Sequence, residues 1–126
     1  MSYKVLIVDD SKLARMAIAK LLGTLHPDWI RVEATNCAEA ITQFTDKGAD
    51  IALVDFNMPG RDGLDLALEL HQLKPGMPLA LVSANTQHEI VSRATEIGAA
   101  FLSKPLTQES LADFLTRAEQ RLGAPL

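Results

Sequence analysis

The stretch "LVDFNMPGRDG" at residues 53–63 decides the fold class. An apolar run from Ile51 to Val54 ends on a carboxylate, Asp55, and a turn-forming Met-Pro-Gly begins three residues later. A short, continuous apolar run bounded by turn residues is typical of a buried strand in a parallel sheet. The charge that ends this strand either caps a turn or has a function of its own.

Similar apolar runs occur on both sides of this strand and predict a strand at each place. The expected strands cover residues 4–8, 30–34, 51–54, 78–83 and 99–103. Helical patterns separate them, so the chain consists of five strand–helix units. Such alternation predicts a doubly wound α/β fold, in which a five-stranded parallel sheet is covered by helices on both faces in three layers.

The helices are predicted from apolar periodicity and from residues that start or stop a helix. The first has an apolar stripe made of Ala14, Ala17, Ile18, Leu21 and Leu22. The second is expected to begin at Asn36 with Glu39 and to end at Gly48, and the third to lie around residues 64–73. The fourth has a capping box at Thr86 and Glu89 and ends at Gly98. The fifth has one apolar face, formed by Leu111, Phe114, Leu115, Ala118 and Leu122.

The composition predicts one ordinary globular domain over residues 1–126, with its core at about residues 3–122. Of 126 residues, 48% are hydrophobic and 22% are charged, which suits a folded chain. The net charge of -4 argues against direct binding to nucleic acid. A single cysteine, Cys37, cannot form an intrachain disulfide, and no secretory leader or membrane span is evident, so we expect a cytoplasmic protein.

Polar residues stand where the predicted strands end. They are Asp9 and Asp10 after the first strand, Asp55 after the third, Ser83 after the fourth and Lys104 after the fifth. Function in such sheets lies at the carboxyl ends of the strands. Carboxylates on adjacent strands, roughly 4.8 Å apart, need a cation between them, and oxygen-only ligands suit Mg²⁺. Each residue alone could simply cap a helix or end a strand, but together they favour a site.

Four motifs in order, "IVDDS", "LVDFNMPGRDG", "LVSA" and "FLSKP", carry a family resemblance. Over nearly its full length the chain resembles the receiver domain of two-component response regulators, of the single-domain, chemotaxis-regulator kind. The resemblance implies a flavodoxin-like sheet with strand order 2-1-3-4-5. It also implies that Asp55 accepts a phosphoryl group from a phosphohistidine on a sensor histidine kinase or phosphotransfer protein.

The resemblance further implies a role for each remaining residue of the Mg²⁺ site. Asp10 and Asp55 correspond to direct ligands of Mg²⁺, as does the backbone carbonyl of Asn57, while Asp9 acts through a water. Lys104 and Ser83 correspond to residues that bond phosphoryl oxygens. The peptide from Lys104 to the following proline is expected to be cis.

A conformational switch is also implied by the resemblance, with Ser83 and Phe101 as its two residues. Phosphorylation would draw the Ser83 hydroxyl inward and leave space for the Phe101 ring. The output would then pass to a downstream protein through the fourth helix, fifth strand and fifth helix. On this interpretation the chain is not an enzyme, because it catalyses only its own phosphorylation and dephosphorylation.

The sequence also leaves other interpretations open. A flavodoxin-type mononucleotide binder would need a hydroxyl- and glycine-rich loop after the first strand, where two carboxylates stand instead. A hydrolase of the haloacid dehalogenase class would need an acid at residue 57, which is Asn57. The receiver could be a stand-alone regulator, which we favour, or a module excised from a longer multi-domain regulator with its own output domain.

Overall fold

The computed structural model describes residues 2–58, 62–84 and 88–123. Strands and helices alternate along the chain, as the sequence predicts. They are β1 (Lys4–Val8), α1 (Lys12–Leu25), β2 (Ile30–Ala34), α2 (Cys37–Lys47), β3 (Ile51–Asp55), α3 (Gly63–Leu73), β4 (Leu79–Ser83), α4 (His88–Glu96), β5 (Ala100–Ser103) and α5 (Gln108–Gly123). The capping residue expected at Thr86 lies outside the described residues.

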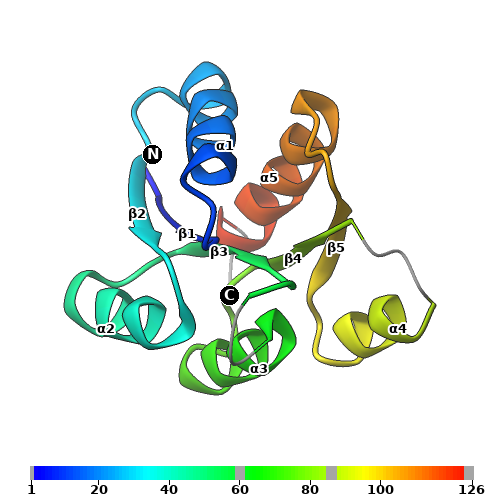
Figure 1. Ribbon diagram of the computed structural model, residues 1–126. Coiled ribbons are helices and arrows are strands. Elements are labelled where there is room, and N and C mark those ends of the chain that lie inside the picture. Colours follow the sequence, from blue (N-terminus) through cyan, green and yellow to red (C-terminus); the bar gives the residue numbers. More distant parts are fainter. Residues whose placement is uncertain (1, 59–61, 85–87, 124–126) are drawn as a thin grey trace.

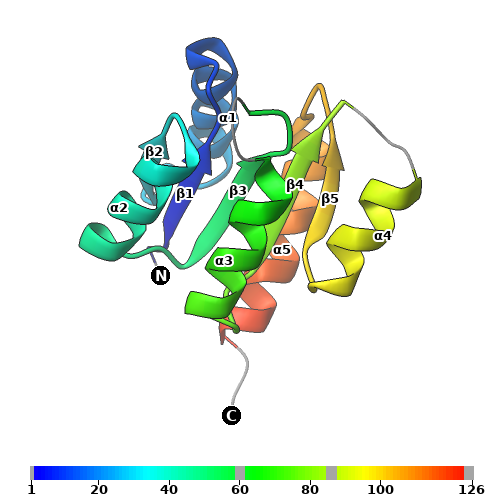
Figure 2. The ribbon, with the colours of Figure 1, turned by 60° about the horizontal axis from the view of Figure 1, so that its bottom comes forward.

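The five strands form one parallel sheet in the order β2-β1-β3-β4-β5. The predicted fold class and strand order are therefore confirmed. Figure 2 shows the arrowheads of all five strands at the same edge of the sheet. β1 and β3 are neighbours, and Val8 is paired with Val54. Asp9 follows Val8 and Asp55 follows Val54, so these two aspartates lie next to one another.

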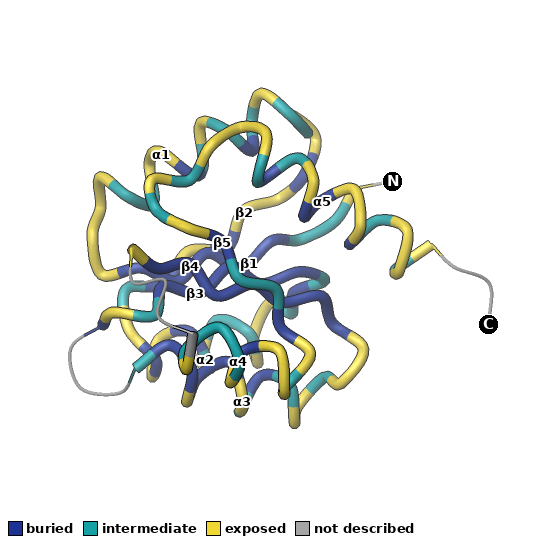
Figure 3. Tube along the Cα trace, turned by 90° about the vertical axis from the view of Figure 1, so that its right-hand side faces the viewer, coloured by how far each residue is buried: buried dark blue, intermediate teal, exposed yellow. Residues whose placement is uncertain are grey.

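Helices cover both faces of the sheet (Figure 1): α1 and α5 lie on one face, and α2, α3 and α4 on the other. In β1, Leu6 and Val8 belong to the core beneath α2 to α4, whereas Val5 and Ile7 belong to the core beneath α1 and α5. Alternate residues of a strand point to opposite faces, so a strand covered on both sides must be apolar throughout. Figure 3 shows the resulting buried layer along the sheet and on the inner sides of the helices.

The ends of α2 follow the predicted signals closely. Asn36 accepts a hydrogen bond from the Glu39 amide at 2.8 Å, and the Glu39 carboxylate accepts one from the Thr35 amide at 2.8 Å. Gly48 ends the helix with a φ of 74°, a conformation that favours glycine. None of the helices in the described parts of the chain combines the length and the apolar character that a membrane span requires.

The apolar stripe of α1 departs from the prediction. Ile18 and Leu22 are buried against the sheet and α5 as expected, but Ala17 is exposed. A hollow of about 410 Å³ lies along this helix, between α1 and the segment that follows β5. The stripe residues that line it are Ala14, Ala17, Ile18 and Leu21. Helical periodicity predicted which way the stripe points, but α5 covers only part of it.

Candidate functional site

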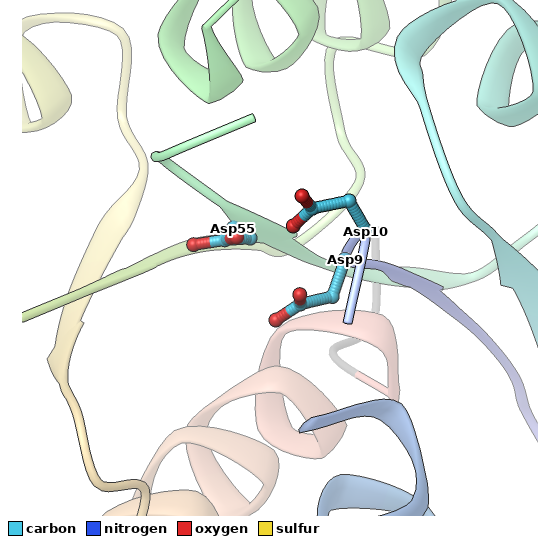
Figure 4. A group of neighbouring side chains, drawn as sticks. All are labelled: Asp9, Asp10 and Asp55. Carbon is cyan, nitrogen blue, oxygen red and sulfur yellow. The ribbon is translucent and has the colours of Figure 1, made fainter. Parts of the chain in front are cut away.

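Three carboxylates converge at the carboxyl edge of the sheet. Asp9 and Asp10 come from the turn after β1, and Asp55 is the last residue of β3. An oxygen from each lies within 4.8 Å of the others, and Figure 4 shows Asp9 and Asp10 directed to the side where Asp55 lies. Asp9 and Asp55 are 1% and 3% exposed, whereas Asp10 is open to solvent. The structure thus brings together the acidic residues that the sequence singled out.

Lys104 supplies a positive charge to this cluster from the turn after β5. Its Nζ lies 3.0 Å from Asp55 Oδ1 and 3.4 Å from Asp9 Oδ2. The main chain is fixed at the same place, because the Lys104 amide donates to the Ser83 carbonyl at 3.0 Å. The peptide between Lys104 and Pro105 is cis, as predicted.

Backbone groups hold the two buried carboxylates in place. The Ser11 amide donates to Asp9 Oδ1 at 2.9 Å, and the Asn57 amide donates to Asp55 Oδ1 at 3.2 Å. Gly63 lies close against the end of β3: its amide donates to the Phe56 carbonyl at 2.9 Å, and a Cβ on Gly63 would lie 2.2 Å from the Asp55 carbonyl oxygen. Only glycine fits at that position without moving the backbone.

Burial dominates the electrostatics of the site. Removal from water raises the pKa of Asp55 above its ordinary 3.8; the Lys104 hydrogen bond opposes this, and the charge of Asp9 adds to it. For Lys104, burial works against the charged form, but the hydrogen bond and charge of Asp55 together with Asp9 outweigh it and raise the pKa. Lys104 therefore stays protonated, yet one ammonium does not offset three carboxylates.

The donor set of this cluster suits a hard divalent cation. All three side chains offer carboxylate oxygens, and the described cluster contains no histidine or thiolate that would favour zinc. An exposed ligand such as Asp10 leaves room for coordinated water, which Mg²⁺ retains in most protein sites. The residues present therefore fit Mg²⁺.

The two residues expected to form a switch lie on neighbouring strands. Ser83 ends β4, is fully buried, and pairs in register with Ser103 of β5. Phe101 is two residues earlier on β5, is partly buried, and packs against the core beneath α2 to α4. Because Asp55 pairs with Val82, the Ser83 side chain belongs to the same edge as the carboxylates.

Sequence reasoning missed the hollow beside the site. Besides the stripe residues of α1, it is lined by Asp9, Val82, Ala84, Lys104, Pro105 and Leu106. Two charged groups of the site thus form one end of an otherwise apolar surface. On α1, Leu13 and Met16 are 78% and 55% exposed. The signal that was present in the sequence was the pair of small residues, Ala14 and Ala17, on the stripe.

Comparison with known proteins decides the family. The model of the response regulator receiver domain matches residues 5–116, which include the three carboxylates, Ser83 and Lys104. The chain belongs to this family. Receiver domains are signalling modules of two-component systems rather than catalytic enzymes. Phosphorylation and Mg²⁺ binding are general features of the family, as are interactions with histidine kinases or phosphotransfer proteins and with downstream targets.

Individual relatives of this receiver domain differ in length. The chain is 38% identical over 120 residues to the positive alginate biosynthesis regulatory protein of Pseudomonas aeruginosa, covering 92% of the chain and 47% of that protein. It is 29% identical over 121 residues to the chemotaxis protein CheY of Thermotoga maritima, and the match covers 95% of this chain and 100% of that protein. The chain thus spans about half the length of the first curated relatives it matches.

A solved structure supports the fold independently. A CheY-like receiver domain protein from Methanospirillum hungatei superposes with a TM-score of 0.88 over 99% of this chain and 100% of that one. The two sequences are 21% identical, so this likeness concerns the fold alone.

Proposed function

We propose that this receiver domain accepts a phosphoryl group on Asp55 from a phosphohistidine of a sensor histidine kinase or phosphotransfer protein. The observation that carries the proposal is the grouping of a buried Asp55 with two further carboxylates and with Lys104 Nζ at 3.0 Å. Phosphoryl transfer needs mainly positioning and charge neutralisation, and this cluster offers both.

The Asp55 carboxylate has one oxygen available as a nucleophile. Among the described residues, both hydrogen bonds to it end on Oδ1, from Lys104 Nζ and from the Asn57 amide, so the lone pairs of Oδ2 are free. As the bond from Oδ2 to phosphorus forms, the bond from phosphorus to the donor nitrogen breaks, and the imidazole keeps that electron pair. Lys104 then bonds one phosphoryl oxygen and the Ser83 hydroxyl another. Later attack by water restores Asp55, so the chain acts only on itself.

The metal site in this proposal uses the three grouped carboxylates together with one main-chain oxygen. Asp10, Asp55 and the backbone carbonyl of Asn57 would hold Mg²⁺ directly, and Asp9 would hold it through a water. When bound, the ion supplies positive charge that offsets the charge of the transferred phosphoryl group.

We assign the conformational response to Ser83 and Phe101. An inward hydrogen bond from Ser83 to a phosphoryl oxygen frees space that the partly buried Phe101 ring occupies. The change reaches a downstream protein through the face of α4, β5 and α5. Moving a two-state element from 1:99 to 99:1 requires about 5.5 kcal/mol of differential stabilisation. Beryllofluoride binding should therefore shift amide resonances as far as residues 86–103, and shifts confined to the immediate neighbours of the phosphoryl group would contradict this route.

The phosphodonor partner is assigned to the other side of the molecule. The hollow along α1 begins at Asp9 and Lys104 and continues over an apolar surface, so a partner seated there has its histidine beside Asp55. The phosphodonor partner and the downstream protein then bind different faces of the domain.

The domain extends over residues 1–126 in this proposal, with its core at about residues 3–122. Both contexts suggested by the sequence stay open, because relatives include a chemotaxis protein of matching length and regulators about twice as long. In the longer context, an output domain would receive the signal in place of a separate protein.

Intact-mass measurement after treatment with acetyl phosphate and Mg²⁺ tests the proposed function. The unmodified chain should gain the mass of one phosphoryl group, and Asp55→Asn should gain none. Asp50→Asn is the matched control, because Asp50 precedes the same strand at its opposite end and accepts the Lys4 amide there at 2.8 Å. It should be phosphorylated normally. An equal adduct on Asp55→Asn would refute the assignment.

A further inference from the structure

Arg15 makes two hydrogen bonds beside the metal-binding turn. It lies near the start of α1, and its side chain is only 13% exposed. Its Nη1 donates to the main-chain carbonyl of Asp9 at 2.7 Å, and its Nε donates to Glu33 Oε1 on β2 at 3.1 Å. Hydrogen bonds from a guanidinium are short and strong, and its fork fixes two acceptors at once. A single side chain thus connects α1, β2 and the turn after β1.

The carbonyl held by Arg15 belongs to the peptide that joins Asp9 to Asp10. The rest of this turn is fixed as well. The Asp9 amide donates a hydrogen bond to the Ala34 carbonyl at 3.1 Å, and Asp9 Oδ1 accepts one from the Ser11 amide at 2.9 Å. Within the described part of the chain, the Asp10 carboxylate has no hydrogen-bond partner of its own. The main chain therefore decides where Asp10 points.

We infer that Arg15 is a positioning residue for the metal site, and that Glu33 anchors it. Arg15 holds the Asp9–Asp10 peptide in the orientation that directs both carboxylates to Asp55. This inference rests on the proposed function, in which these carboxylates hold Mg²⁺. Arg15 itself touches neither the metal nor the phosphoryl group.

A positioning role and a purely electrostatic role predict opposite signs for Arg15→Ala. If Arg15 acted only as a charge, its removal would leave the carboxylates less neutralised, and Mg²⁺ would bind more tightly. If Arg15 positions the turn, its removal loosens the ligands and weakens binding. Outer partners of metal ligands typically affect affinity by about 10- to 100-fold, so we expect the Kd for Mg²⁺ to rise about ten-fold.

Arg31 provides a matched control for structural effects. It also connects β2 to α1, because its Nη1 donates to the Ala19 carbonyl at 3.2 Å. Arg31 pairs in register with Val5, so it belongs to the half of the sheet remote from the carboxylates. Arg31→Ala should therefore leave the Kd for Mg²⁺ unchanged.

The experiment is a titration of the chelator-washed chain with Mg²⁺ alone, followed through the amide resonances of Ser11 and Asn57. In the metal-free spectrum, Arg15→Ala should shift the Asp10 and Ser11 amides, whereas Arg31→Ala should not. If Arg15→Ala does not fold, Glu33→Ala tests the same role by removing the anchor, and it should also weaken binding.

The outcomes separate this inference from the proposed function. A Kd for Arg15→Ala equal to or tighter than that of the unmodified chain overturns the positioning role and leaves the metal site intact. Absence of a saturable Mg²⁺ response in the unmodified chain overturns the metal site itself, and the inference falls with it.

Discussion

Lys104→Met removes the positive charge of the site while keeping a long, unbranched side chain. The two carboxylates that Lys104 contacts have side chains only 2% and 3% exposed, so they lose their neutralising partner without gaining water. Breaking a fully buried ion pair costs about 3–5 kcal/mol, whereas an exposed pair is worth about 1 kcal/mol or less. The Lys104 side chain is 30% exposed, so we expect a loss of about 2 kcal/mol in the free energy of unfolding.

Mg²⁺ should reverse much of this loss, because the ion takes over the neutralisation of the carboxylates. A ligand present at about 100 times its Kd stabilises the folded state by about 2.7 kcal/mol. Since Lys104→Met leaves the carboxylates more negative, Mg²⁺ should bind it more tightly and stabilise it more than the unmodified chain. Urea denaturation followed by far-ultraviolet circular dichroism gives the free energy of unfolding. It is measured for the unmodified chain and for Lys104→Met, each in chelator and in Mg²⁺.

Lys74→Met is the control for this experiment. Lys74 Nζ also contacts a carboxylate and a carbonyl, Asp50 at 3.9 Å and Ala49 at 2.7 Å, but its side chain is 43% exposed. Its loss should be below about 1 kcal/mol and independent of Mg²⁺. A Lys104→Met variant that loses no more than this control, or that gains no more from Mg²⁺ than the unmodified chain, would contradict the electrostatic account of the site.

Three further outcomes are expected. Burial raises the pKa of Asp55, so its ionised form opposes folding at neutral pH. Asp55→Asn should therefore have a higher free energy of unfolding than the unmodified chain when both are measured without metal. In urea titrations, this difference in stability should shrink as the pH falls toward 3.8. Gly63→Ala should lose about 1–3 kcal/mol by backbone overlap, whereas Gly76→Ala, with open space around its Cβ, should lose little in the same assay. Trp29 precedes β2 at the opposite edge of the sheet, so Mg²⁺ should leave its fluorescence nearly unchanged; a saturable quench absent in Asp10→Asn would place the indole or the metal elsewhere.

Much of this architecture could be predicted from the sequence because its signals are local. Each strand is a short apolar run, and a parallel sheet brings the residues that follow these runs to one edge. Asp9, Asp55 and Lys104 could therefore be grouped before their distances were known. The end of α2 at Gly48 was equally local, because a φ of 74° suits glycine.

Features that depend on how elements pack could not be predicted in the same way. Periodicity indicated the apolar face of α1, but it could not show that α5 leaves Ala17 and Leu21 along an open hollow. Arg15 in the sequence resembles any solvated residue near a helix start. Only the arrangement of α1 beside β2 brings its guanidinium to the Asp9 carbonyl and to Glu33.

The most direct test of the central claim is to locate the phosphoryl group after reduction with borohydride. Hydride reduces an acyl phosphate to an alcohol, so a phosphorylated aspartate becomes homoserine and can be found by tandem mass spectrometry. We predict homoserine at Asp55 after treatment with acetyl phosphate and Mg²⁺, and none when Mg²⁺ is replaced by chelator. Homoserine at Asp9 or Asp10, or an adduct that resists reduction, would contradict the account.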